Sequence, residues 1–310
     1  MSQQARIARQ GTINIILKDS YRHSDAAALE KNQEKVQVPY FRTIDGYFSS
    51  IIGMEGLKLQ MKEIYAQLFI EQKRQEVGLK NNRQVLHMIF KGNPGTGKTT
   101  VARRVAELFK EMNVLESGHF IEVDRSELVG EYIGHTAQKT KELIKKAMGG
   151  VLFIDEAYSL ARGGEKDFGK EAIDTIVKCM EDHHDQLIII LAGYPFEMEE
   201  FLGTNPGLAS RFPIQLEFQD YSADELRDIA KVMLLEKDYR LTPEAERKLC
   251  HHLSLLHHDP PRNFSNARYV RNVIEEAIRK HAYRLANRVD WDKKDLMLLE
   301  PGDFHLTFDK

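Results

Sequence analysis

The chain has 310 residues, of which 42% are hydrophobic and 29% charged, and these proportions exclude collagen-like, low-complexity and extensively disordered classes. Its 44 basic and 47 acidic residues leave a net charge of −3, which argues against nucleic acid or a membrane surface as partner. The longest strongly apolar run, residues 187–192, is far shorter than the roughly 20 residues that span a bilayer. Two cysteines and no secretory leader pattern indicate a reducing, cytoplasmic location.

Residues 1–47 differ in character from the rest and predict a separate N-terminal appendage. Residues 12–17 predict one short strand, whereas residues 25–37 are polar and charged with few apolar anchors. Such a composition is typical of a mobile arm. We therefore expect the first globular domain to begin near residue 48.

Between residues 48 and 220, apolar strand segments alternate with amphipathic helices. This alternation predicts an α/β domain with a parallel five-stranded sheet. Residues 214–218 alternate in polarity like a half-buried edge strand, and the other strands are continuous apolar runs, as expected when helices cover both faces. Those runs are residues 87–90, 120–123, 151–154 and 187–192, and the expected helices include residues 139–148 and 171–181.

After Asp220 the strand signals nearly stop, and residues 221–310 predict a smaller, mostly helical domain. Ser222 and Glu225 have the spacing of a capping box, in which each side chain bonds the other residue's backbone amide. Thr242 followed by Pro243 predicts a second helix start. A third helix is expected over residues 266–285, where apolar residues recur at helical spacing.

The strongest single motif is Gly92-x-x-x-x-Gly97-Lys98-Thr99, between a predicted strand and a predicted helix. Its glycines permit a tight turn that points successive backbone amides at phosphate oxygens. Lys98 supplies positive charge to the β- and γ-phosphates, and the Thr99 hydroxyl is a ligand for Mg²⁺. The motif therefore predicts a nucleoside triphosphate site.

An acidic pair, Asp155 and Glu156, directly follows the apolar strand at residues 151–154. Asp155 sits where its carboxylate can face the metal shell, and Glu156 can orient and polarise the attacking water. Phosphoryl transfer requires this combination of charge neutralisation and nucleophile positioning. We therefore predict hydrolysis of ATP with Mg²⁺.

These motifs, with a helical domain behind an α/β domain, resemble AAA+ ATPases over roughly residues 48–300. Within that family, the Gly130–Thr136 and Asp155–Leu160 segments look like the CbxX/CfxQ group, which includes red-type Rubisco activases and sporulation proteins. The phosphate loop and the 161–169 segment most resemble the sporulation members, which implies a role in spore formation. The nucleotide-contacting positions implied are Ile52, Gly53, Asn93, Pro94, Gly95, Thr96, Gly97, Lys98, Thr99, Thr100 and Asp155.

The resemblance also implies two arginines for the reaction. Arg211 matches the arginine finger, which reaches the γ-phosphate of a neighbouring subunit and so requires an oligomer, expected to be a hexameric ring. Arg268 matches the sensor-2 arginine of the lid domain, and Arg271, one helical turn further on, is the competing candidate. Tyr194 departs from the family, which usually has a small polar residue after the fourth strand, so its role stays open.

Tyr132, Ile133 and Gly134 match the family's pore loop, which grips an extended protein or peptide substrate. An aromatic side chain supplies large contact area with few rotatable bonds, and the flanking Gly130 suggests mobility. Residues 159–169 could form a second such loop. Two alternatives stay open at this point: an activase for a metabolic enzyme such as red-type Rubisco, and an ATP-dependent switch or scaffold that does not thread substrate.

Overall fold

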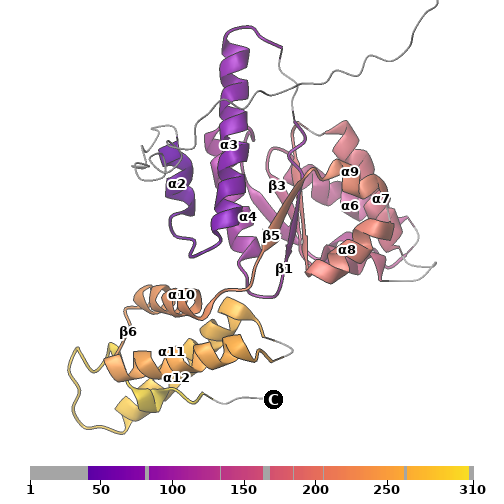
Figure 1. Ribbon diagram of the computed structural model, residues 1–310. Coiled ribbons are helices and arrows are strands. Elements are labelled where there is room, and N and C mark those ends of the chain that lie inside the picture. The colour runs from indigo at the N-terminus through magenta and orange to yellow at the C-terminus, as the bar shows by residue number, and fades with distance from the viewer. Residues whose placement is uncertain are drawn as a thin grey trace, which may run out of the picture. The chain divides into compact units, whose positions relative to one another are not determined.

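Five strands form one parallel sheet in the order β2-β3-β4-β1-β5 (Figure 1). The computed structural model describes residues 41–80, 84–132, 134–162, 168–183, 185–204, 206–261 and 264–306, so the strand expected at residues 12–17 lies outside the described residues. The predicted parallel five-stranded sheet is confirmed. Its strands are β1 (Met88–Gly92), β2 (Phe120–Val123), β3 (Val151–Ile154), β4 (Ile188–Gly193) and β5 (Ile214–Phe218).

Burial along the strands follows the polarity pattern of the sequence. Every residue of β3 and β4 is buried, whereas β5 at the sheet edge alternates between exposed and buried positions. In the central register Met88 of β1 lies between Ile190 of β4 and Ile214 of β5. Because all strands are parallel, the segments that follow β1, β3 and β4 leave the same edge of the sheet, where α/β proteins bind ligands.

Helices cover both faces of the sheet and form two separate cores (Figure 1). The first face packs against α2 (Arg42–Phe48), α3 (Glu55–Glu76) and α4 (Lys98–Glu111), and the second carries α5 (Arg125–Leu128), α6 (His135–Ala147), η2 (Ala157–Ala161), α7 (Gly169–Asp182), α8 (Pro195–Thr204) and α9 (Pro206–Arg211). Ile44 and Phe48 of α2 are buried in the first core. The boundary expected at residue 47 therefore falls inside a helix that packs with the sheet.

Helix α6 begins four residues before the predicted start at residue 139. Gly134 precedes it with a φ of 82°, a conformation that glycine adopts without steric penalty. The buried Thr136 hydroxyl accepts a hydrogen bond from the Gly130 amide at 2.9 Å and closes the preceding turn. The first turn of α6 is polar, so it carries little of the apolar periodicity on which the prediction rested.

The C-terminal part of the chain is mostly helical, as predicted, with a core of its own. The Ser222–Glu225 capping box is confirmed, and the Thr242 hydroxyl accepts from the Ala245 amide at 3.2 Å. The helices are α10 (Ala223–Leu235), α11 (Pro243–His258), α12 (Asn266–Ala286) and η3 (Pro301–Asp303). A parallel pair, β6 (Arg240–Leu241) and β7 (Leu298–Leu299), was not predicted, because two residues are too few to show a period.

Helix α12 is fastened to the end of the chain by one arginine. Arg284 donates to both carboxylate oxygens of the buried Asp303 at 2.9 Å. Burial by itself raises the pKa of Asp303, but the Arg284 bonds and the Glu300 amide outweigh it and leave the pKa lowered.

Among the described residues, no helix combines the length and apolar character needed to cross a bilayer.

Candidate active site

One cavity of about 420 Å³ gathers most of the residues that the motifs single out. It opens where the carboxyl edge of the parallel sheet faces α10 and α12. Tyr194 and Arg271, whose roles the sequence leaves open, also line it. The predicted residues that line it are Ile52, Pro94, Gly95, Thr96, Gly97, Lys98, Thr99, Thr100, Asp155, Glu156 and Arg268.

The phosphate loop joins β1 directly to the N-terminus of α4. Gly95 and Gly97 have φ values of 70° and 91°, which β-carbon sterics disfavour in other residues. The Thr96 hydroxyl donates to the Asn93 carbonyl at 2.8 Å within the turn. A tight loop of this kind before a helix N-terminus is suited to bind phosphate oxygens through backbone amides.

Lys98 is held inside the loop and is only 9% exposed. Its Nζ donates to the Gly92 carbonyl at 2.7 Å and the Asn93 carbonyl at 2.9 Å. Burial lowers the pKa of Lys98, opposed by the nearby Asp155 carboxylate and assisted by Arg268. The ammonium group is therefore close enough to interact electrostatically with Asp155 and Glu156 of the acidic pair and with Arg268 of α12.

The acidic pair sits where β3 ends, in a strained turn. The Glu156 amide donates to Asp155 Oδ1 at 3.0 Å. Glu156 itself has a φ of 45°, in the left-handed region that a residue with a β-carbon seldom occupies. Such backbone strain is concentrated at functional sites, and Glu156 lines the same cavity as Lys98.

Tyr194, directly after β4, lies beside this chemistry. The Lys98 Nζ lies 5.8 Å from the centroid of the Tyr194 ring, and the centroids of the Tyr158 and Tyr194 rings are 5.7 Å apart. Burial and the Glu156 carboxylate raise the pKa of Tyr194. The phenol therefore stays protonated at neutral pH and can donate a hydrogen bond into the cavity. Its place after a central strand was the available signal.

Several predicted residues lie outside the cavity lining. Gly53 has a φ of 65° and packs against the Glu225 carboxylate, and Asn93 donates to Asp220 at 2.9 Å. Arg211 donates to the Gly207 carbonyl at 2.7 Å and pairs with Glu181 of α7. Tyr132 and Gly134 lie in the exposed segment before α6, and Ile133 lies outside the described residues, as do residues 163–167 of the 159–169 segment.

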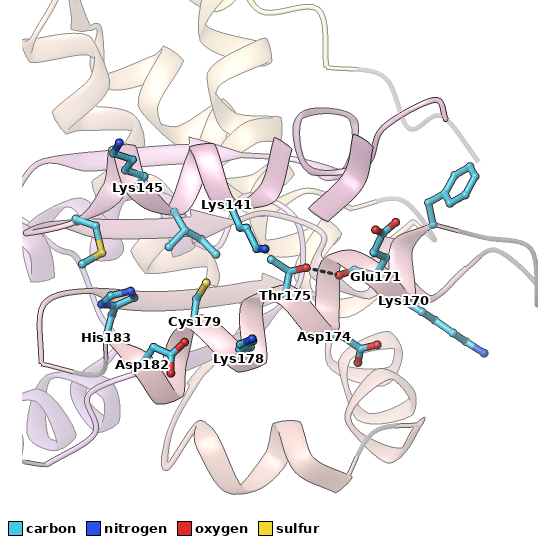
Figure 2. Close-up of a pocket in the computed structure, with 13 residues that line it drawn as sticks. Lys141, Lys145, Lys170, Glu171, Asp174, Thr175, Lys178, Cys179, Asp182 and His183 are labelled. Atoms are coloured by element: carbon cyan, nitrogen blue, oxygen red, sulfur yellow. Dashed lines mark hydrogen bonds between the residues drawn. The ribbon is translucent and has the colours of Figure 1, made fainter. Parts of the chain in front are cut away.

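A larger groove of about 950 Å³ lies between α6 and α7 but lacks comparable chemistry. Figure 2 shows Cys179 of α7 directed toward α6, and the Thr175 hydroxyl donating to the Glu171 carbonyl of its own helix at 2.7 Å. Burial raises the pKa of the Cys179 thiol, so it is not an activated nucleophile. The described residues also contain no cluster of three or more His, Cys, Asp or Glu side chains suited to a metal. The smaller cavity at the sheet edge is therefore the candidate site.

Two family models match the chain. Residues 88–220 match the "ATPase family associated with various cellular activities (AAA)", and residues 222–310 match the "AAA lid domain". The solved FIGL-1 AAA domain in complex with ADP superposes with a TM-score of 0.57, covering 83% of this chain and 81% of that one. At 21% sequence identity, this similarity is evidence for the fold and not for the activity.

Curated relatives extend over most of the chain. Stage V sporulation protein K of Bacillus subtilis is 55% identical, with 96% of this chain and 94% of that protein covered. CbbX of Cereibacter sphaeroides is 48% identical, covering 76% of each chain, and the chloroplastic ribulose bisphosphate carboxylase/oxygenase activase of Cyanidioschyzon merolae is 46% identical, covering 78% and 82%. The predicted family is confirmed. The chain belongs to the CbxX/CfxQ group of AAA+ ATPases, and the reaction that it catalyses is the hydrolysis of ATP.

Proposed function

We propose that this ATPase is a protein remodeller that works as a cytoplasmic ring of six subunits and pulls on a protein or peptide substrate. The observation that carries the proposal is the exposure of Tyr132, whose side chain is 64% accessible in the segment between β2 and α6. An exposed aromatic ring is suited to grip polypeptide without reading its sequence.

The segment that carries Tyr132 has a firm base. Lys139 donates to the Ser126 and Val129 carbonyls at 2.6 and 3.2 Å, and Thr136 accepts from the Gly130 amide. The Tyr132 ring meets the His135 ring edge-on at a centroid distance of 5.4 Å. A segment with a fixed base and an exposed aromatic side chain can transmit a pull to its substrate, which supports the pore-loop role of residues 132–134.

In the proposed reaction, Glu156 orients a water molecule and accepts its proton while the water oxygen bonds to the γ-phosphorus of ATP. The bond from phosphorus to the bridging oxygen breaks, ADP leaves, and Lys98 offsets the charge that develops on the phosphates. Thr99 and Asp155 are the oxygen ligands that would hold Mg²⁺, and both line the same cavity as Lys98. Bound Mg²⁺ would supply charge neutralisation at the β- and γ-phosphates.

Arg211 is the residue that we propose to act in trans. Its partner Glu181 is more than half exposed, and an exposed ion pair of this kind contributes only about 0–1 kcal/mol. Little free energy therefore opposes the exchange of Glu181 for the γ-phosphate of a neighbouring subunit. A finger of this type requires a ring, which supports the hexamer. Arg268, with Arg271 as the competitor, would contact the phosphates from α12 of the lid.

The biological setting that we propose is spore formation. The relative named stage V sporulation protein K matches nearly the whole chain, and this supports the assignment. The second candidate, activation of a metabolic enzyme, is favoured by the relative named as an activase of ribulose bisphosphate carboxylase/oxygenase. Deletion of the gene in a spore-forming host distinguishes them: the first requires a sporulation defect, and the second requires activation of inhibited red-type Rubisco by the purified protein.

The remodelling mechanism is tested by comparing Tyr132→Ala with Tyr132→Phe. An unfolded, fluorescently labelled polypeptide is the probe, and its ATP-dependent translocation is expressed per ATP hydrolysed. We expect at least about a tenfold loss for Tyr132→Ala and near-normal coupling for Tyr132→Phe, because the ring supplies the contact area. Equal coupling in both variants would remove the pore-loop proposal and favour the switch or scaffold alternative.

A further inference from the structure

Three successive carbonyls of the phosphate loop accept hydrogen bonds from groups outside the loop. The Pro94 carbonyl accepts from Asn266 Nδ2 at 3.3 Å, and the Gly95 carbonyl accepts from the Ala267 amide at 3.2 Å. The Thr96 carbonyl accepts from the Tyr221 hydroxyl at 3.2 Å. All three donors belong to the lid side of the molecule: Tyr221 precedes α10, and the other two begin α12.

Bonds to these carbonyls fix the directions of the loop amides. In a trans peptide the C=O and N–H groups of one planar unit point to opposite sides. The units whose carbonyls belong to Pro94, Gly95 and Thr96 carry the amides of Gly95, Thr96 and Gly97. A donor that holds the C=O of one unit therefore also fixes the N–H of that unit, which points the opposite way. The three amides oriented in this manner are phosphate-binding groups of the loop.

Asn266 is built into this arrangement with little freedom. It is completely buried and has a φ of 47°, a left-handed conformation that asparagine tolerates better than most residues. Its Oδ1 accepts from the Tyr221 amide at 3.0 Å, and its Nδ2 donates to Asp220 Oδ1 at 2.8 Å as well as to Pro94. Asp220 in turn accepts from Asn93 at the start of the loop.

The loop and the lid meet backbone to backbone. A β-carbon on Gly95 would overlap the Ser265 carbonyl, and one on Gly97 would lie 3.2 Å from the Tyr221 hydroxyl. Because Gly95 has no side chain between its backbone and that of Ser265, a shift of α12 at this point must be taken up by the loop itself. The two glycines thus serve the contact with the lid as well as the turn.

We infer that Tyr221 and Asn266 are positioning residues that set the loop's affinity for nucleoside di- and triphosphates by holding the peptide planes of residues 94–97. The lid then acts as part of the phosphate cradle, and its seating on the loop and phosphate binding strengthen each other. This inference rests on the proposed nucleotide site around Lys98.

The first test is Tyr221→Phe, which removes one donor and leaves the ring in place. We expect the KM for ATP and the Kd for ADP to rise about threefold to tenfold, the value of one hydrogen bond, with kcat changed less than twofold. The matched control is Tyr239→Phe, the same chemical change on a lid tyrosine that packs beside His281. Thermal unfolding shows whether either variant has lost structure.

The second test is Asn266→Asp, which keeps the shape and the acceptor for the Tyr221 amide. It removes the donor to Pro94 and sets two carboxylates against each other, so we expect the KM for ATP to rise about tenfold or more. Adding Asp220→Asn restores a donor and an acceptor between the two positions. This relieves the charge repulsion but not the missing donor to the Pro94 carbonyl, so we expect the KM for ATP of the double variant to stay about threefold to tenfold raised.

The inference is overturned if Tyr221→Phe raises the KM for ATP no more than Tyr239→Phe does, whether or not Asn266→Asp folds. It is also overturned if the double variant Asn266→Asp/Asp220→Asn binds ATP as tightly as the unaltered protein, because that variant lacks the donor to the Pro94 carbonyl. Lys98→Ala separates this inference from the proposed site. If Lys98→Ala abolishes ADP binding while Tyr221→Phe binds normally, only the positioning role fails, whereas normal binding by Lys98→Ala removes the site itself.

Discussion

Two glycine-flanked segments of the same domain differ in how they are held. The 92–99 loop is fastened over a long sequence distance, with its carbonyls bonded by Tyr221, Asn266 and Ala267. The 130–134 segment is held by bonds close in sequence and exposes Tyr132. The Gly130 amide donates to the Thr136 hydroxyl, and Lys139 donates to the Ser126 and Val129 carbonyls just before the segment. Glycine at Gly95 permits close approach of another backbone, whereas Gly134 has open space around its missing β-carbon.

The difference matches what each segment is proposed to bind. A phosphate has fixed geometry, and amides that are already oriented bind it without an ordering cost. A polypeptide substrate varies in sequence, so an exposed ring on a loosely bounded tip accommodates more partners than a rigid pocket. Glycine therefore allows tight packing against the lid in the 92–99 loop and leaves open space around the 130–134 segment.

The largest expected effect concerns Arg211, through which hydrolysis at the 92–99 loop of one subunit would depend on its neighbour in the hexamer. Arg211→Ala should lower ATP turnover about 10³-fold or more while ATP binding is kept, because an arginine finger stabilises charge only in the transition state. Phosphate release and nucleotide titration measure the two quantities. Arg247→Ala on the exposed face of α11 is the matched control, since its pair with Glu244 is a surface contact. Unchanged turnover in Arg211→Ala would contradict the ring.

Glu156→Gln should lower turnover about 10²-fold or more and retain ATP, because the amide keeps the side chain's size but is a poor base for water. In the ATP-bound variant we expect assembly to six subunits, measured by light scattering after size-exclusion chromatography with and without ATP. A variant that keeps its cellular function would favour the switch alternative. A variant that stays monomeric with ATP would speak against the hexamer.

Alanine at each glycine sharpens the comparison directly. Gly95→Ala combines a strained φ of 70° with a clash against Ser265, and a combined penalty of ~3 kcal/mol predicts about a 100-fold loss of ATP affinity. Gly134→Ala has a φ of 82° but nothing within 4 Å of the new carbon. It should cost only about 1–2 kcal/mol of unfolding free energy. Similar effects of both changes on ATP affinity would show that the lid contact does not matter.

The smallest expected effect is on the stability of Tyr132→Ala. Because the ring is mostly exposed, the free energy of unfolding should change by no more than about 0.5 kcal/mol. Urea denaturation measures this change, and a midpoint equal to that of the unaltered protein is expected. A loss above about 2 kcal/mol would mean that the ring packs into the fold and is not available to a substrate.

Much of the fold was predictable from local pattern. The apolar strands at residues 120–123 and 151–154, the Ser222–Glu225 capping box and the Thr242–Pro243 helix start each depend on residues close in sequence. The phosphate-loop motif and the acidic pair were readable for the same reason. The polar first turn of α6 and the two-residue strands β6 and β7 were not, since they carry too little periodicity.

The family and its ATP chemistry were thus determined by the sequence itself, because short motifs encode phosphate-binding loops and strand-end carboxylates within a few residues. Only the tertiary structure decided that Tyr194 lies beside Lys98, and that Tyr221 and Asn266 bond a loop more than 120 residues earlier in the chain. Contacts over such distances arise from how the sheet and the lid pack together. No local spacing in the chain encodes that packing.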